Sequence, residues 1–360
     1  MVDTMTQEAF KGNPTPVFLL DGAHQAVAEG EFTVWPDDLV LQAVAREFNQ
    51  SETIFVRLGH EGEERNGDHE RDEKSSGENG LRRLTPRVSN PDKTDCTHYL
   101  IRSFTPYKEE PFCGHGIVGA AYLLGRSAEG DPPVGATMRF RTVGGIVVDA
   151  QVRSDDHNAR IDTGDRVDHH LECDYGVLRT MKLEIPAQPV TEWFTEDLKL
   201  MQTIATALGF ETAQVLALGR NALMDLVIEL SADVDFSAAN MEIDAVALME
   251  ASPPGTRSQI ITTGGARYGV DFVKRVFAYG SEDQATGSTY CVLIPYWGAA
   301  LQKSFMKVKQ VSERTGGADV ANSATREGYV TLCGAGVKVM EGRMLVPGSA
   351  RKKYCVGVDE

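Results

Sequence analysis

The sequence predicts an α/β fold of the α+β type, built from two similar domains in which most strands are antiparallel. The chain has 360 residues, and at about 150 residues per domain this length predicts two domains. A strand–turn–helix segment occurs twice, half a chain apart, which indicates a duplicated architecture. Short strand patterns follow one another without the regular strand–helix alternation that is typical of a parallel sheet.

The duplicated segment ends at Gly116 in its first copy and at Thr289 in its second. In both copies a β-type run leads to an acidic turn, then to a glycine and an apolar helical run. At one constant offset the aligned pairs are Arg102 with Arg275, Phe104 with Phe277, Glu109 with Glu282, Glu110 with Asp283, Gly114 with Gly287, and His115 with Ser288. Glycine at a helix start lets a ligand approach the free N–H groups, which bind anions. Two such starts facing each other would form an anion-binding cleft.

Taken in order, the first half starts with a turn and a strand over residues 7–20. Pro and acidic residues then open an amphipathic helix over 36–48. The first half is also expected to contain a strand from about 53 to 56, a helix over 117–124, and strands over 99–103, 137–141 and 145–152. Between the strands predicted at 53–56 and 99–103, residues 60–94 are almost all charged, Gly, Ser, Asn or Pro. That composition predicts a flexible, solvated insertion.

The second half alternates strand and helix patterns less regularly. Helices are predicted over 196–208, 241–251 and 290–301. Strands are predicted over 214–218, 223–229, 258–263, 268–278, 306–311, 329–332 and 337–340. We place the first domain at residues 1–140, the second at 141–345 and a C-terminal tail at 346–360.

Composition narrows the class of function. The formal net charge of −16 disfavours nucleic acid or an anionic membrane surface as a partner. We expect a cytoplasmic protein, because the sequence opens with no signal-like segment and has no apolar run of about 18 residues. Six scattered cysteines without a C-x-x-C pair predict reduced thiols. Without a metal-ligand spacing, a glycine-rich dinucleotide motif or a P-loop, neither a metal nor another cofactor is expected.

Six short motifs carry a family resemblance. In chain order they are Gly12-Asn13-Pro14, Asn49-x-Ser51-Glu52-Thr53, Phe104-Thr105-Pro106, Gly114-His115, Glu282-Asp283-x-Ala285-Thr286-Gly287-Ser288 and Gln310-x-Ser312-x-Arg314-x-Gly316-Gly317. Together they resemble the phenazine biosynthesis PhzF-like family, which shares its fold with diaminopimelate epimerase. The resemblance spans nearly the whole chain outside 60–94. Two positions depart from it, because Gly116 and Gln284 stand where the family usually has proline.

The resemblance implies two similar domains, each a curved, mostly antiparallel sheet around a central helix, and an active site in the cleft between them. It also implies a homodimer and a reaction without a cofactor. It assigns the general base to Glu52, and it completes the catalytic site with His115, Asp283 and Ser288. As substrate-binding residues we predict Gly114 and Gly287, whose N–H groups would meet a carboxylate, together with Cys113 and Thr286.

The chemistry that these residues predict is proton abstraction from carbon. Convergent N–H donors would stabilise the charge that develops beside a substrate carboxylate. Glu52 needs a raised pKa to act as a base near neutrality, which partial burial would supply. Returning the proton at another carbon would move a double bond. We therefore expect an isomerase that acts on a small carboxylate-bearing metabolite, for instance an amino acid.

Two alternatives stay open at this point. Cys113-Gly114-His115-Gly116 is similar to the first cysteine motif of proline-racemase-like enzymes, so a one-cysteine epimerase or racemase, or a dehydratase, could use Cys113. The second cysteine of such enzymes is absent from the facing turn, 283–287. The other alternative is a non-catalytic scaffold that binds a small acid or a protein.

Overall fold

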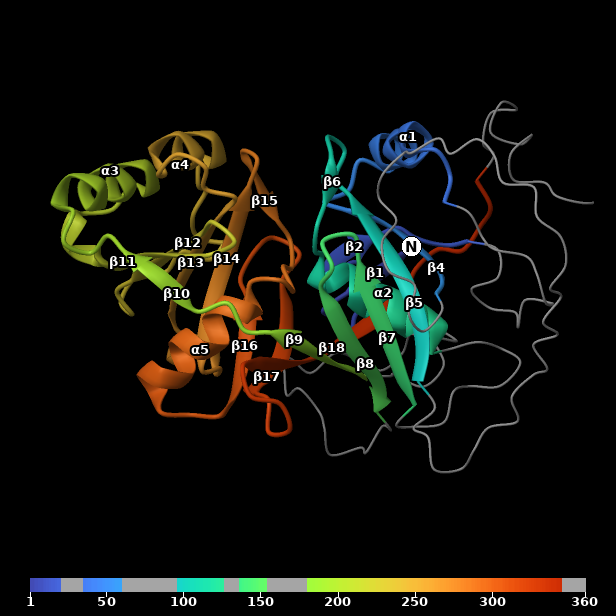
Figure 1. Ribbon diagram of the computed structural model, residues 1–360. Helices are drawn as coiled ribbons and strands as arrows, with labels where there is room; N and C mark the ends of the chain where they lie inside the picture. Colours follow the sequence, from blue (N-terminus) through green and yellow to red (C-terminus); the bar gives the residue numbers. More distant parts are fainter. Residues whose placement is uncertain (21–34, 60–95, 126–135, 154–179, 345–360) are drawn as a thin grey trace, which may run out of the picture.

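The computed structural model of the protein describes residues 1–20, 35–59, 96–125, 136–153 and 180–344. The predicted insertion and the predicted tail, 60–94 and 346–360, lie outside the described residues. Figure 1 shows two α/β halves side by side, one drawn in blue to green and the other in yellow to orange. This arrangement agrees with the two similar domains that the duplicated segment predicts.

Short strands and two helices make up the first half. In chain order its elements are β1 (Val2–Thr4), β2 (Asn13–Thr15), β3 (Val17–Leu19), α1 (Asp38–Phe48), β4 (Thr53–Leu58), β5 (Cys96–Phe104), β6 (Glu109–Glu110), α2 (Gly114–Leu124), β7 (Thr137–Thr142), β8 (Val147–Arg153) and β9 (Thr180–Pro186). The carboxylate of Asp37 caps α1 by accepting the N–H of Leu39 at 3.0 Å, and Asn49 ends the helix in the left-handed conformation.

The second half repeats this order with additional helices. In chain order its elements are β10 (Val190–Trp193), α3 (Leu198–Leu208), η1 (Thr212–Gln214), β11 (Val215–Asn221), β12 (Asp225–Leu230), α4 (Ala245–Ala251), β13 (Ser258–Gly264), η2 (Ala266–Tyr268), β14 (Phe272–Ala278), β15 (Ser281–Asp283), α5 (Tyr290–Leu301), β16 (Phe305–Gln310), β17 (Gly316–Asn322) and β18 (Tyr329–Lys338).

Strand pairing shows the duplication directly. In the first half the ladder runs β3-β4-β5-β7-β8-β9, and only β3–β4 and β5–β7 are parallel in the described part. In the second half it runs β12-β13-β14-β16-β17-β18, with β12–β13 and β14–β16 as the parallel pairs. The two ladders meet where β9 pairs with β18. Each half therefore has the same mostly antiparallel order, as predicted.

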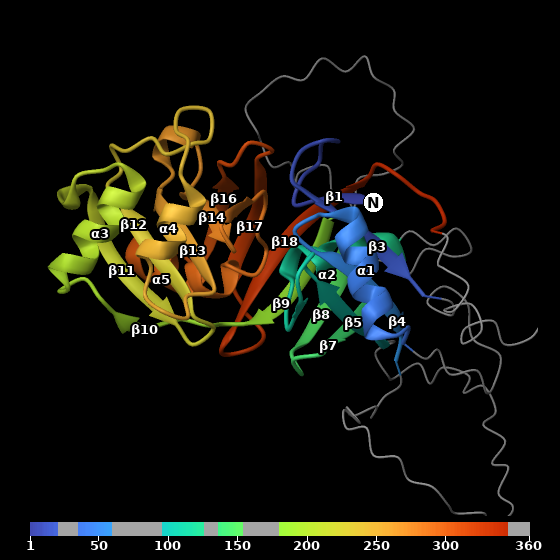
Figure 2. The ribbon, with the colours of Figure 1, turned by 90° about the horizontal axis from the view of Figure 1, so that it is seen from above.

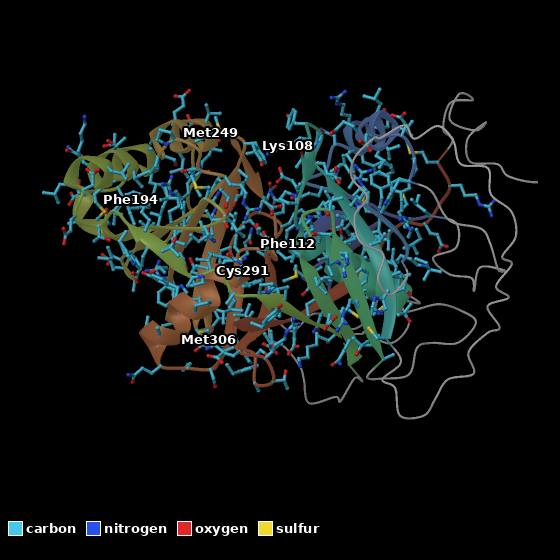
Figure 3. All side chains as sticks on the ribbon, viewed as in Figure 1. Lys108, Phe112, Phe194, Met249, Cys291 and Met306 are labelled. Atoms are coloured by element: carbon cyan, nitrogen blue, oxygen red, sulfur yellow. The ribbon has the colours of Figure 1, made fainter. Side chains whose placement is uncertain are left out.

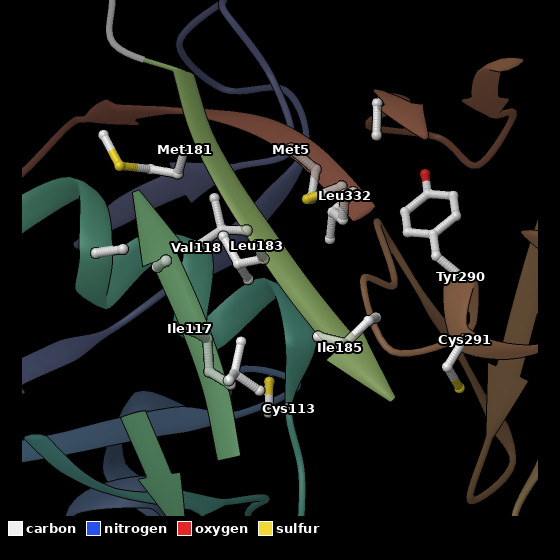
Figure 4. Packing of buried hydrophobic residues seen from close by; sticks show 14 of the residues in the cluster. Met5, Cys113, Ile117, Val118, Met181, Leu183, Ile185, Tyr290, Cys291 and Leu332 are labelled. Carbon is white, nitrogen blue, oxygen red and sulfur yellow. The ribbon is translucent and has the colours of Figure 1, made fainter. Parts of the chain in front are cut away.

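The helices α2 and α5 occupy the centres of the two halves. Nearly every residue of α2 is buried, and so is the first turn and a half of α5. Both helices share one apolar core with the inward side chains of β9 and β18, such as Leu183 and Leu332 (Figure 4). The predicted central helices are thus confirmed, and each buries several apolar side chains in the shared core.

The other helices cover the outer faces of the sheets. Figure 2, which looks at the molecule from above, shows α1 over β4 and β5, and α3 and α4 over the strands of the second half. Two smaller apolar clusters lie beneath them, one around Phe55 and Phe104 and the other around Phe236 and Phe277.

Among the predicted boundaries that differ from the structure, two differ for reasons that the local structure makes plain. The helix predicted over 241–251 begins at Ala245, because the carboxylate of Asp244 caps it by accepting two backbone N–H groups at 3.0 Å each. The strand predicted over 268–278 begins at Phe272. Before it, η2 is followed by Gly269, whose φ of 69° breaks the extended conformation.

None of the helices in the described part of the chain has both the length and the apolar character needed to cross a membrane.

Candidate active site

The starts of the two central helices touch each other through their glycines. A Cβ added at Gly114 would lie 2.6 Å from the carbonyl carbon of Gly287, and one added at Gly287 would lie 2.6 Å from the backbone nitrogen of His115. These contacts explain why glycine occupies both positions of the duplicated segment. They also refine the prediction, because an anion has no room between the two glycines and would have to bind beside them.

Unpartnered backbone N–H groups surround this contact. Within the described residues, the N–H groups of Gly114, His115, Gly287 and Ser288 donate no hydrogen bond, whereas Gly116 already donates to the sulfur of Cys113 and Tyr290 to the carbonyl of Gly287. All four residues are buried. Free donors at two helix starts, each at the positive end of a helix dipole, attract an anion.

Glu52 is the residue just before β4, and its side chain reaches the start of α2. Its side chain is 18% exposed, and its Oε2 atom lies 3.3 Å from Nε2 of His115. That oxygen is buried and makes no hydrogen bond among the described residues. Burial raises the pKa of Glu52 well above its usual value, and the negative charges of Asp283 and Glu110 raise it further. A carboxylate with these surroundings is more basic than an exposed one.

His115 lies between Glu52 and a polar network that joins the two halves. The Nδ2 atom of Asn13 lies 3.5 Å from Nδ1 of His115 and donates to Oδ1 of Asp283 at 2.6 Å. The same nitrogen also donates to the carbonyl of Ala285 at 3.2 Å, so both hydrogens of the Asn13 amide nitrogen go to residues of the second half. Burial lowers the pKa of His115, so the ring is neutral at neutral pH. Three of the predicted catalytic residues are therefore brought together.

Thr286 is held by the protein itself. Its hydroxyl donates to Oδ2 of Asp283 at 2.5 Å, its N–H donates to Gln310 at 2.9 Å, and its carbonyl accepts from the buried ammonium of Lys274. Lys274 also donates to the hydroxyl of Thr289 at 2.5 Å. The substrate-binding role predicted for Thr286 therefore becomes, in our proposal, a role in positioning Asp283.

The last two predicted side chains lie at the same helix starts. Ser288 is 8% exposed, and its hydroxyl makes no hydrogen bond within the described part of the chain. Cys113 caps α2 by accepting the N–H of Gly116 at 3.3 Å, and its sulfur lies 3.6 Å from both ring nitrogens of His115. Burial, followed by the charge of Glu52, raises the pKa of Cys113 well above that of a free thiol. An undissociated thiol is a poor base.

Glu52, Cys113 and His115 could also hold a metal ion, since their ligand atoms all lie within 4.8 Å of one another. Carboxylate, thiolate and imidazole are ligands of Zn²⁺. Coordination would require the Cys113 thiol to lose its proton, against the effect of its burial. The expected absence of a metal stays a prediction.

Sequence reasoning missed several residues at this site. Asn13 and Ser51 belonged to the motifs of the resemblance, yet no role followed for them; here Ser51 donates to Oδ1 of Asn13 at 3.0 Å. At the upper edge, where Figure 3 labels Lys108, the hydroxyl of Tyr279 donates to Glu110 across the two halves at 2.6 Å. This contact depends on how the halves face each other, so no local pattern could have indicated it.

Comparison with known proteins supports the same family. A family model described as phenazine biosynthesis-like protein matches residues 84–342. The human phenazine biosynthesis-like domain-containing protein is 27% identical over 353 residues, which cover 96% of this chain and 97% of that protein. A protein of Halalkalibacterium halodurans, named an uncharacterized isomerase, is 26% identical over 351 residues and covers the same shares.

Solved structures support the fold. A PhzF family phenazine biosynthesis protein from Bacillus anthracis superposes with a TM-score of 0.60 at 18% identity, covering 96% of this chain and 97% of that one. A predicted epimerase from Pseudomonas aeruginosa gives a TM-score of 0.58 at 19% identity, covering 96% and 98%. The predicted diaminopimelate epimerase-like fold is confirmed. Because the family model spans most of the sequence, the chain belongs to the phenazine biosynthesis-like family.

Proposed function

We propose that the protein is a cofactor-independent isomerase that moves a proton on a small carboxylate-bearing metabolite. The observation that carries the proposal is a buried, unpartnered oxygen of Glu52 beside free N–H groups from two helix starts. The Glu52 carboxylate is suited to take a proton, and the N–H groups are suited to stabilise the negative charge that results. The relatives that are named as isomerases support the general class of reaction.

In the proposed reaction, the N–H groups of Gly114, His115, Gly287 and Ser288 hold the substrate carboxylate. Glu52 takes a proton from a neighbouring carbon: the C–H bond breaks, an O–H bond forms, and the electron pair spreads into the carboxylate. The N–H groups stabilise this added charge because they are already aimed at it. Glu52 then returns the proton at another carbon of the conjugated system, so the double bond moves and the atoms balance.

The neighbours of Glu52 have supporting roles in this proposal. Neutral His115, whose Nε2 atom lies 3.3 Å from Oε2 of Glu52, can relay a proton between Glu52 and the substrate. Asp283 accepts from Asn13 and so holds the amide of Asn13 next to the ring of His115. Ser288 offers a free hydroxyl to the substrate.

The one-cysteine alternative is less well supported. Inversion of a stereocentre needs an acid on the face opposite the base, and the counterpart of Cys113 in the second copy is Thr286, whose polar groups are already bonded. The undissociated state of Cys113 also argues against it as the first base.

Solvent deuterium exchange tests the proposal. Unsaturated carboxylic acids and α-amino acids would be incubated with the protein in D₂O, and incorporation at carbon followed by NMR. We expect incorporation into at least one acid, and a loss of about 10²–10⁴-fold in the Glu52→Gln variant. Glu192→Gln is a matched control, since Glu192 pairs with Arg220 on the surface. The exchange should survive treatment with a metal chelator.

Unchanged exchange in Glu52→Gln would overturn the assignment of the base. Saturable binding of an acid without any exchange would instead favour the non-catalytic scaffold. The variant should fold well, because replacing a buried carboxylate that has no hydrogen-bond partner removes a desolvation cost.

A further inference from the structure

The start of β13 is the counterpart of the start of β4, where Glu52 lies. In the first half Thr53 pairs with Phe104, and in the second half Gln259 pairs with Phe277. Phe104 and Phe277 align in the duplicated segment, so Thr53 and Gln259 occupy equivalent positions. The duplication therefore relates the residues just before β4 to those at the start of β13.

One residue earlier, Ser258 is the counterpart of Glu52, and Arg257 is the counterpart of Ser51. The base of the first half has no acidic equivalent in the second half; a cation lies next to that position instead. The bond from the indole of Trp297 to Thr262 at 2.9 Å shows that α5 lies against β13. Besides burial, the charges of Asp225 and Arg257 act on the pKa of Cys291 in the first turn of α5, so Arg257 lies on the α5 side of the site, as Glu52 lies on the α2 side.

The guanidinium of Arg257 is held in a fixed orientation. Its Nε and Nη2 atoms each donate to a different carboxylate oxygen of Asp225 at 2.8 Å. Asp225 is fully buried and also accepts from Ser258 at 2.7 Å and from Asn221 at 3.1 Å. A bidentate pair of this kind fixes the plane of the guanidinium.

The remaining edge of the guanidinium is available. No hydrogen bond to Nη1 of Arg257 is found within the described residues, and the side chain is 23% exposed. Its positive charge acts on the site, because it lowers the pKa of Glu52 against the stronger effect of burial. By contrast, Lys274 is fully buried and bound to Thr286 and Thr289, so it cannot reach a ligand.

We propose that Arg257 binds a second carboxylate of the substrate through its free Nη1 edge, so that the substrate is a small dicarboxylate. This inference rests on the proposed function. The carboxylate next to the reacting carbon would bind the N–H groups of the helix starts, because its negative charge increases during proton transfer. The second carboxylate, whose charge does not change in the reaction, would bind Arg257. An arginine fixed by Asp225 is suited to that task because its orientation costs little on binding.

Binding measurements test this assignment without turnover. Succinate and glutarate would each be compared with their monomethyl esters by calorimetry, on the full chain. We expect the wild-type protein to bind a dicarboxylate about tenfold to a hundredfold more tightly than its ester. Arg257→Gln should lose this preference, and Arg257→Lys should keep part of it.

Arg220→Gln is the matched control. Arg220 also forms a two-pronged ion pair, with Glu192 at 3.0 and 2.6 Å, but its Nη1 is occupied by the carbonyl of Pro254. The control should keep the preference for the dicarboxylate. Asp225→Asn should weaken that preference although Arg257 remains, because the guanidinium is no longer held as tightly.

Three results would overturn the inference: equal affinity of the wild-type protein for diacid and ester, no measurable binding of either diacid, or an unchanged preference in a folded Arg257→Gln variant. Circular dichroism checks the fold of each variant. Failure of the proposed isomerase function is distinguishable, since it appears as unchanged deuterium exchange in Glu52→Gln, whereas the dicarboxylate preference is measured at equilibrium.

Discussion

In the first half of the molecule Arg102 donates to both oxygens of Glu109, at 2.8 and 2.7 Å, and in the second half Arg275 does the same with Glu282, at 2.6 and 2.7 Å. Both arginines are almost completely buried. These pairs support the hairpin that precedes each central helix. The duplication has kept the same ion pair in the same place in both halves.

The residues that the two halves present to the site have diverged. At equivalent positions the first half has Ile101, Cys113, His115 and Glu52, and the second half has Lys274, Thr286, Ser288 and Ser258. The proposed proton-transfer groups Glu52 and His115 thus come from the first half, whereas the second half contributes Asp283, the hydroxyl of Ser288 and the cation of Arg257. The duplicated scaffold therefore carries its proton-transfer groups in one half only. This arrangement suits a proton shift better than an inversion at one carbon, which needs an acid and a base on opposite faces of that carbon.

The largest effect is expected where the two halves are most alike. Gly114→Ala and Gly287→Ala should each destabilise the protein by about 3 kcal/mol or more, because the added Cβ would meet the backbone of the other half at 2.6 Å. Thermal or denaturant unfolding measures this loss. Similar costs at the two glycines would show that the contact is equivalent from both sides.

Gly264→Ala provides the control, since nothing lies within 4 Å of a Cβ at that position. If the loss of unfolding free energy in either helix-start variant is no larger than in Gly264→Ala, then the close contact between the helix starts is not what holds the halves together.

A smaller effect is expected where the halves differ. Lys274→Met should cost about 1–3 kcal/mol, because the carbonyl of Thr286 and the hydroxyl of Thr289 lose a buried donor. Burial lowers the pKa of Lys274 to about 7 in the folded protein, from 10.5. The unfolded chain then binds more protons above pH 7, so this lysine makes the folded state more stable as pH rises from about 7 towards 10.

The pH dependence of unfolding should therefore be flatter in Lys274→Met than in the wild type. Ile101→Met, at the equivalent position of the first half, should leave the pH dependence unchanged. If unfolding free energy depends on pH in the same way in the wild type and in Lys274→Met, then Lys274 has an ordinary pKa. In that case positions 101 and 274 would not differ in the way described.

The smallest effect is expected at the contact between the two halves. Tyr279→Phe removes the hydroxyl that donates to Glu110 at 2.6 Å, and Tyr279 is 43% exposed. We expect a loss of about 1 kcal/mol in unfolding free energy. Tyr107→Phe is a suitable control because Tyr107 is 76% exposed. An equal change in both variants would show that the contact adds no stability.

Much of the fold followed from local patterns. The helix predicted over 290–301 has those bounds in the structure, because its run of apolar residues is long enough to continue the helix through Pro295. Strand β17 was missed because Gly, Asp and Asn in Gly316–Asn322 are typical of turns. The two short strands predicted near the end form the single strand β18, since pairing with β9 and β1 continues across the glycines between them.

The site was less accessible to sequence reasoning. Glu52, His115 and Asp283 were identified through the resemblance, and the structure brings them together. Arg257 and Lys274 carry no local signal, because an arginine before a strand and a lysine within one are ordinarily solvent-exposed. Their relation to the site follows only from the register of β13 and β14, which a single sequence does not specify.

The pairing of β1 with β18 has a consequence for biosynthesis. Val2 pairs with Lys338, and the amino group of Met1 donates to the carbonyl of Met340 at 2.7 Å. The first strand therefore leaves the ribosome long before its partner has been made. Until then the sheet of the first half has an open edge, which other chains could pair with. The ladders that β1 and β9 make with β18 are therefore the last to form, once the second half has been translated.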